Sequence, residues 1–169
     1  MSVELTPVDW AKRPIVEKYA DFTGRAPRPE YWWYVLAVVV AFVVARVIES
    51  ILGIGHMLFY TYGPLSALLW LATIVPSLAV GARRLHDTDR SGWWLLICVV
   101  PYALMALAGI MAVMGGGLLA FLGMMGLIGF VALIGGLVLL YFMVLPGTPG
   151  QNRYGAPPAS DSGTVVPAG

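Results

Sequence analysis

The chain has 169 residues, of which 59% are hydrophobic and 11% are charged. Soluble globular domains average roughly 45–50% apolar and about 25% charged residues, so this composition excludes an ordinary water-soluble domain and indicates a lipid bilayer as the surroundings. A net charge of +1 excludes the strongly basic surface of a typical nucleic-acid-binding protein. The single cysteine, Cys98, excludes an intramolecular disulfide and a cysteine-rich metal site.

The N-terminal segment, residues 1–30, carries ten charged residues, against seven in residues 31–145 and two in residues 146–169. It contains no apolar run of about 7 to 15 residues, so we expect no cleavable secretory signal and a mature chain that keeps its N-terminus. Apolar residues recur at helical intervals from Val8 to Phe22, which predicts an amphipathic helix. This helix either lies in the membrane interface or packs on the cytoplasmic loops. Pro14 predicts either a kink or a helix that starts there.

The apolar segments predict four membrane-spanning helices. Crossing a hydrocarbon core about 30 Å thick takes about 20 apolar residues. Residues 93–145 contain no charge and are far too long for one crossing, and glycines 115–117 are the natural place for the chain to turn back. One crossing plus a re-entrant hairpin is the alternative for this segment. The predicted fold is an all-α membrane protein with helices over residues 31–52, 63–85, 93–114 and 118–145.

The orientation follows from the lysine and arginine residues that flank the spans. With the N-terminus in the cytoplasm, nine of the ten lie on the cytoplasmic side, and only Arg46 lies toward the outside. The positive-inside rule therefore predicts that both termini are cytoplasmic. Residues 156–169 are rich in Pro, Ala, Gly and Ser, which predicts a disordered end of the cytoplasmic tail.

Polar and proline residues inside the spans leave a transport function open. Arg46 and Glu49 form an i,i+3 pair near the outer end of the first span, which we interpret as structural because Arg46 can extend to the outer headgroups. Pro76 and Pro101 are expected to kink their helices. A small-solute or ion transporter or channel is the alternative function, and it would require a continuous polar cavity across the bundle.

Three polar motifs lie on the predicted cytoplasmic face. They are F-T-G-R…R-P-E-Y-W-W at residues 22–33, R-R-L-H-D-T-D-R-S-G-W-W at residues 83–94, and P-G-T-P-G-Q-N-R-Y-G at residues 146–155. In this order they resemble the bacterial inner-membrane YhaH-like family, a domain of unknown function numbered 805, over about residues 10–155. The resemblance implies a small multi-pass protein of the bacterial cytoplasmic membrane, and it implies no activity, substrate or cofactor.

We predict that the three motifs form one polar cluster at the inner face. In one interpretation its arginines converge on an anionic phospholipid headgroup, because guanidinium groups bind phosphate and carboxylate bidentately. In the other, acids and arginines neutralise each other and connect the loops. The expected contacts are membrane lipids, anionic ones among them, a partner protein or a second copy of the chain, and no nucleic acid. The cluster residues are Arg25, Glu30, Arg83, Arg84, His86, Asp87, Arg90, Asn152 and Arg153.

The histidine motif predicts local pairing more strongly than catalysis. If the second span continues past the membrane as a helix, Arg83 and Asp87, and likewise His86 and Arg90, stand four residues apart on one face. One histidine with neighbouring acids lacks the spaced ligands of a closed metal site, and no nucleophile or phosphate-loop signature occurs. We therefore expect no enzyme activity, metal or cofactor. A membrane enzyme using His86 and Asp87 is the second alternative.

Overall fold

The computed structural model describes residues 5–54, 63–113 and 117–158. Within these ranges the chain forms helices, one 3-10 turn (η1) and an isolated bridge between Asn152 and Gly155, with no strand. Helices α2 to α5, with η1 leading into α4, are long and apolar enough to cross a membrane, which confirms the all-α membrane fold. The elements are α1 (Pro7–Val16), α2 (Arg28–Ile51), α3 (Pro64–Asp87), η1 (Gly92–Leu95), α4 (Leu96–Val113) and α5 (Leu118–Val144).

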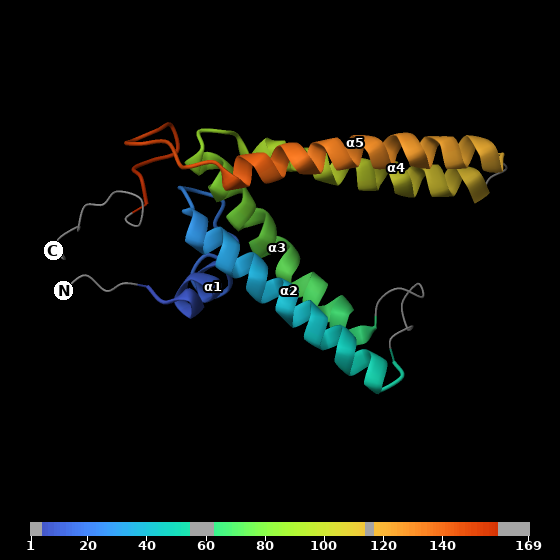
Figure 1. The fold of residues 1–169 in the computed structure, drawn as a ribbon, viewed down its shortest axis with the longest axis horizontal. Helices are drawn as coiled ribbons and strands as arrows, with labels where there is room; N and C mark the ends of the chain where they lie inside the picture. Colours follow the sequence, from blue (N-terminus) through green and yellow to red (C-terminus); the bar gives the residue numbers. More distant parts are fainter. Residues whose placement is uncertain (1–4, 55–62, 114–116, 159–169) are drawn as a thin grey trace.

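The four long helices form two antiparallel hairpins, α2 with α3 and α4 with α5 (Figure 1). The hairpins diverge from a common end, where α1 and the segment after α5 also lie. Of the glycines expected to separate the last two helices, Gly117 is the N-cap of α5, and the other two lie outside the described residues. Most of the expected disordered end of the tail, residues 159–169, also lies outside them.

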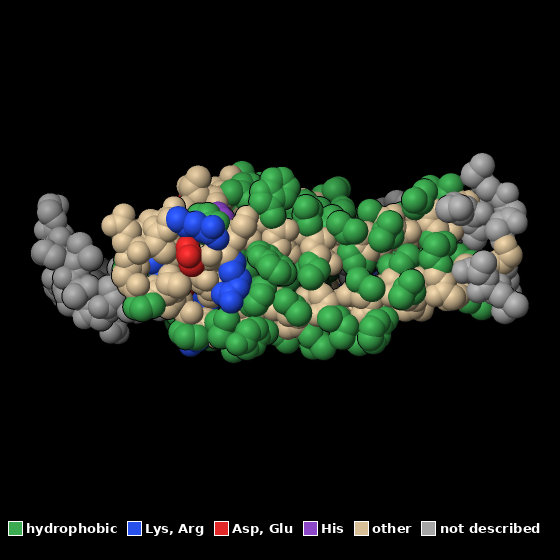
Figure 2. Space-filling model, turned by 90° about the horizontal axis from the view of Figure 1, so that it is seen from above, with side chains coloured by type: hydrophobic (Ala, Val, Ile, Leu, Met, Phe, Trp, Pro, Cys, Tyr) green, Lys and Arg blue, Asp and Glu red, His purple; other side chains and the backbone are tan. Residues whose placement is uncertain are grey.

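The sides of the long helices expose large apolar side chains. Val43 is 57% exposed, Leu68 64% and Leu127 65%. Figure 2 shows apolar side chains along the length of the helices and charged side chains gathered toward one end. Exposure of apolar surface to water costs about 25 cal/mol per Å². These faces are therefore suited to lipid, and the charged end is suited to the aqueous boundary.

Helix α1 begins with a reciprocal cap. The Thr6 hydroxyl accepts the Asp9 N–H at 3.3 Å, and the Asp9 carboxylate accepts the Thr6 N–H at 3.0 Å. This capping box satisfies two amide donors that the first turn leaves without helical partners. The start near Pro14, one of the two expectations, is wrong, because this cap sets the first helical residue at Pro7 and Pro14 is buried inside the helix.

The N-terminal segment also compensates for the proline in α3. Pro76 has no N–H to donate to the carbonyl of Ala72, four residues earlier. The Tyr19 hydroxyl donates to that carbonyl at 2.8 Å. The Tyr34 hydroxyl, on α2, donates at 3.2 Å to the carbonyl of Thr73, the residue that follows Ala72 on α3. Side chains from two other parts of the chain thus occupy the backbone acceptors beside the proline.

At the opposite end of the first hairpin, Glu49 caps the start of α3. Its side chain is fully buried and accepts the Ser66 N–H at 2.7 Å and the Ser66 hydroxyl at 2.6 Å. Arg46 lies 3.5 Å from the same carboxylate. The N-cap residue of α3, Gly63, has no side chain to accept these donors, so a carboxylate from α2 does so, where the positive end of the helix dipole favours an anion.

Candidate functional site

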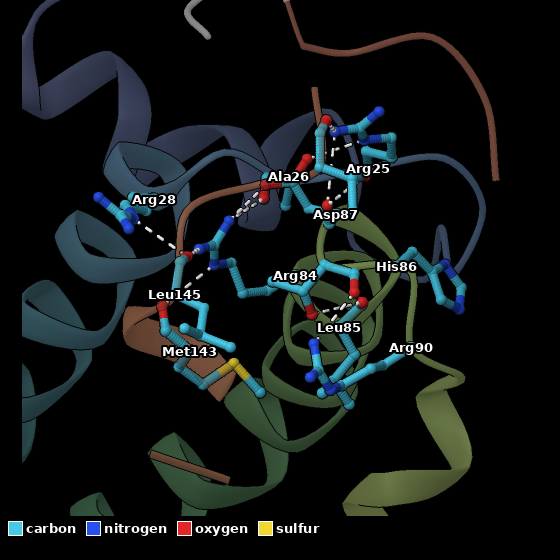
Figure 3. A network of polar contacts seen from close by, with 12 residues as sticks. Arg25, Ala26, Arg28, Arg84, Leu85, His86, Asp87, Arg90, Met143 and Leu145 are labelled. Atoms are coloured by element: carbon cyan, nitrogen blue, oxygen red, sulfur yellow. Dashed lines mark hydrogen bonds and ion pairs between the residues drawn. The ribbon is translucent and has the colours of Figure 1, made fainter. Parts of the chain in front are cut away.

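Asp87 is the acid at which the first and second motifs meet. It ends α3, its side chain is fully buried, and its carboxylate accepts from Arg25 Nε at 2.8 Å and from Arg84 Nη1. Arg25 comes from the segment before α2, whereas Arg84 lies three residues earlier on α3. Charge-assisted hydrogen bonds of this kind are roughly twice as strong as neutral ones. One carboxylate therefore connects α3 to the N-terminal segment (Figure 3).

The third motif and the end of α5 contribute backbone carbonyls to the same two arginines. Arg25 donates to Thr148 O and Gly150 O, both at 2.7 Å. Arg84 donates to Met143 O at 3.1 Å and to Leu145 O. The carbonyls of Met143 and Leu145 lie at the C-terminal end of α5, where they lack helical partners and carry the negative end of the helix dipole, so the guanidinium group of Arg84 suits them. Figure 3 shows Arg84 reaching these carbonyls, with Arg28 on Leu145 O as well.

We call the three side chains and the four carbonyls the Asp87 cluster. Every nitrogen of the two guanidinium groups donates to an acceptor within it, and the cluster joins three segments that are more than fifty residues apart along the chain. It consists of Asp87, Arg25, Arg84 and the carbonyls of Met143, Leu145, Thr148 and Gly150.

His86 packs beside this cluster. Its ring stacks on Tyr154, with centroids 3.8 Å apart and planes 4° from parallel, and Nδ1 lies 3.2 Å from Gly24 O. Asn152 donates to the His86 carbonyl at 2.9 Å. The imidazole points away from Asp87 (Figure 3), whose carboxylate is held by two arginines. These contacts make His86 a packing residue between the motifs and give no support to a His86/Asp87 catalytic pair.

Glu30 forms a second buried ion pair. Its carboxylate accepts from Arg83 Nη1, and both side chains are at most 1% exposed. Arg13 of α1 approaches the other oxygen at 3.4 Å and is 32% exposed. The pair links α2 to α3, and Arg13 adds α1. Two further nitrogens of Arg83, Nε and Nη2, are buried without a hydrogen-bond partner in the described part of the chain.

The remaining two arginines lie at the edge of the site. Arg90 stacks on the Phe142 ring at 4.1 Å, and Arg153 pairs with Asp89 at 3.2 Å, where both side chains are about half exposed. The five arginines predicted from the sequence thus divide between three acids and an aromatic ring.

The two i,i+4 pairs expected on α3 are wrong. Arg83 pairs with Glu30 because α2 brings that acid beside α3, and Asp87 pairs instead with Arg84 at i,i+3. His86 and Arg90 do not share a helical turn, because α3 ends at Asp87. Ser91 is the N-cap of η1, where its hydroxyl accepts the Trp93 N–H at 3.4 Å.

The sequence pointed to side chains and missed the carbonyl acceptors, Arg13 and the role of Gly147. A Cβ on Gly147 would lie 2.9 Å from Asp87 Cγ, so the P-G-T motif needs glycine there for space. Gly150 has a φ of +72°, a conformation that favours glycine. The sequence feature that could have indicated Gly147 and Gly150 is the glycine- and proline-rich run directly after the last apolar segment. Within the described ranges, no three His, Cys, Asp or Glu side chains group as a metal site would require.

The fold and this site define a small polytopic helical membrane protein whose three polar motifs meet at one end of the helices. A family model described as "Protein of unknown function (DUF805)" matches residues 19–156, which include all three motifs. The chain belongs to the DUF805 family, as the motifs predicted.

Three relatives from Escherichia coli K12 show the breadth of this similarity. Inner membrane protein YhaI is 38% identical over 144 residues, covering 85% of this chain and 91% of YhaI. Inner membrane protein YhaH is 30% identical over 151 residues, covering 89% and 97%. Uncharacterized protein YiiR is 34% identical over 140 residues, covering 80% and 84%. No solved structure is significantly similar to the chain.

Proposed function

We propose that the protein is a multi-pass protein of the bacterial cytoplasmic membrane whose Asp87 cluster organises the helix bundle at the cytoplasmic face, with anionic lipid bound at the rim. The observation that carries this proposal is the shared carboxylate of Asp87. It holds Arg25 and Arg84, which in turn hold the carbonyls that follow α5. The two hairpins diverge from this end, so the cluster is well placed to set their relative arrangement (Figure 1).

The guanidinium nitrogens of Arg25 and Arg84 all donate hydrogen bonds to protein acceptors, which supports a structural role for these two arginines. Their side chains are at most 1% exposed, and their donors already have protein acceptors. A phosphate group could bind them only by displacing those acceptors. Lipid headgroups are better matched to exposed cations nearby, such as Arg28 and Lys12, since anionic leaflets attract such residues by about 1 kcal/mol each.

The cytoplasmic position of the cluster is tested by cysteine labelling. In a Cys98→Ala background, we expect Lys12→Cys and Gln151→Cys to react with a membrane-impermeant maleimide only after permeabilisation of the inner membrane. Ser50→Cys, at the other end of α2, should react in spheroplasts. Labelling of Gln151→Cys from the periplasm would contradict the proposal, because the third motif could then not share a compartment with the predicted cytoplasmic loops.

The organising role is tested by limited proteolysis in native membranes. Asp87→Ala and Arg84→Ala should each make the loops at the cluster end markedly more susceptible than Arg46→Ala does. Arg46 is the matched control because it is also in an ion pair but is 45% exposed, and its partner Glu49 keeps the Ser66 donors. Equal susceptibility of all three variants would reject the proposal. Native mass spectrometry would test the lipid contact, with retained phosphatidylglycerol expected on the wild type and less on Arg28→Gln.

A further inference from the structure

Arg83 differs from the two other buried arginines of this site. All three nitrogens of Arg84 donate to protein acceptors, and so do those of Arg25. Arg83 is equally buried, yet only its Nη1 has an acceptor, Glu30, whereas Nε and Nη2 have none among the described residues. Arg83 and Arg84 are neighbours on α3, so two adjacent buried arginines differ in how many of their nitrogens have acceptors.

A buried guanidinium with unmet donors is costly. The group carries five N–H donors and keeps its charge in proteins. Leaving a buried donor without an acceptor costs about 1–3 kcal/mol, and more when the group is charged. Native proteins contain few such groups, and a missing water, ion or ligand commonly accounts for them. Arg83 therefore calls for an acceptor from outside the described chain.

The position of the two nitrogens narrows the chemistry of that acceptor. Nε and Nη2 lie on the same edge of the guanidinium plane, the edge that donates two parallel hydrogen bonds to a carboxylate or phosphate. Glu30 is shared between Arg83 and Arg13, and the second acid of Arg13, Glu17, is 66% exposed, so the buried part of this group has no excess of negative charge that would repel an anion. We propose that this edge of Arg83 is a binding site for one oxyanion of the phosphate or carboxylate class, with Glu30 orienting the guanidinium from its other side.

Access to the site requires a local movement, since both nitrogens are buried. Helix α1 reaches this ion pair through one side chain. Its contact with Glu30 is made by Arg13 at 3.4 Å, and Arg13 is partly exposed and already shared with Glu17. A phospholipid headgroup and free phosphate both supply the required oxyanion. The site deepens the lipid contact proposed above, and only the lipid source rests on that proposal.

The test measures anion-dependent thermal stability of the full chain. Wild type in detergent is titrated with sodium phosphate against sodium chloride at matched ionic strength. In parallel, it is compared in phosphatidylcholine nanodiscs with and without phosphatidylglycerol. Stabilisation by phosphate in detergent assigns a free anion, and stabilisation by phosphatidylglycerol alone assigns a lipid headgroup. A wild type that responds to neither anion overturns the site and leaves a bound water as the acceptor.

Two variants separate anion binding from a structural role. Arg83→Lys keeps the charge but lacks the paired donors, so the anion affinity should fall between about tenfold and a hundredfold. Glu30→Gln keeps a side-chain oxygen that can accept from Arg83 Nη1 and orient the guanidinium, and it removes the competing negative charge, so the anion affinity should be unchanged or higher even if the fold is less stable. Arg153→Lys, an exposed Arg-to-Lys control, should respond like wild type. An unchanged response in Arg83→Lys, or a lost response in Glu30→Gln, would overturn the assignment.

The result is also separable from the organising role of the Asp87 cluster. Asp87→Ala should increase proteolysis while the anion response at Arg83 persists, whereas Arg83→Lys should lose the response with the loops still protected. If Asp87→Ala leaves proteolysis unchanged, the proposed organising role of the Asp87 cluster is rejected. The anion site at Arg83 is then judged separately, by the anion titration.

Discussion

Replacement of Asp87 by asparagine should destabilise the protein strongly, because it removes the charge and leaves the shape. The carboxylate accepts charge-assisted hydrogen bonds from Arg25 at 2.8 Å and from Arg84, and all three side chains are at most 1% exposed. Hydrogen bonds to charged groups contribute about 1.5–3 kcal/mol each. Removal of one partner of a buried ion pair costs about 3–5 kcal/mol, since the remaining charge stays buried. We expect Asp87→Asn to lower the free energy of unfolding by about 3–5 kcal/mol.

Asp89→Asn is the matched control, two residues further along the chain. Asp89 also pairs with an arginine, Arg153 at 3.2 Å, but the two side chains are 48% and 59% exposed. Exposed pairs contribute about 0–1 kcal/mol. Asparagine also tolerates the φ of +57° at this position. Equilibrium unfolding in detergent, followed by tryptophan fluorescence, gives both values. If the free energies of unfolding of the two variants lie within about 1 kcal/mol of each other, burial of Asp87 does not determine how much its ion pairs contribute to stability.

Two further predictions concern the second hairpin and the N-terminal segment. A Cβ on Gly135 would lie 2.9 Å from Ile97 Cγ1, so Gly135→Ala should destabilise the contact between α4 and α5 by about 1–3 kcal/mol in the same unfolding assay. Gly136→Ala, with no described atom within 4 Å, should be neutral or stabilising by up to about 1 kcal/mol, and equal effects would contradict this packing. The Thr23 hydroxyl and N–H, which donate to Asp21, lower the pKa of that carboxyl from 3.8 to about 2. Because the folded pKa is the lower one, this stabilisation is complete above about pH 4 and is lost as the pH falls through 2. Thr23→Val should raise the pKa of Asp21 in an NMR titration, and an unchanged value would exclude the hydroxyl as the main cause.

The sequence by itself determined the class of the protein and the number of its long helices. The length of an apolar run is a local property, and a bilayer of roughly constant thickness converts that length directly into a crossing. For this reason the uncharged segment 93–145 predicted two helices, and the structure ends α4 at Val113 and begins α5 at Leu118. The motifs likewise predicted the DUF805 family, because they are short runs of residue types that can be recognised without knowledge of their contacts.

The tertiary structure alone decided which groups meet. The i,i+4 spacing on α3 favoured an ion pair between Arg83 and Asp87. In the structure α2 places Glu30 beside Arg83, and Asp87 pairs with Arg84, three residues earlier on the same helix. More than half of the Asp87 cluster, four of its seven groups, consists of backbone carbonyls such as that of Leu145, and the residue type does not show which carbonyls take part. Pairing energies of buried charges depend on distance and burial across elements, so they become readable only after the helices are packed.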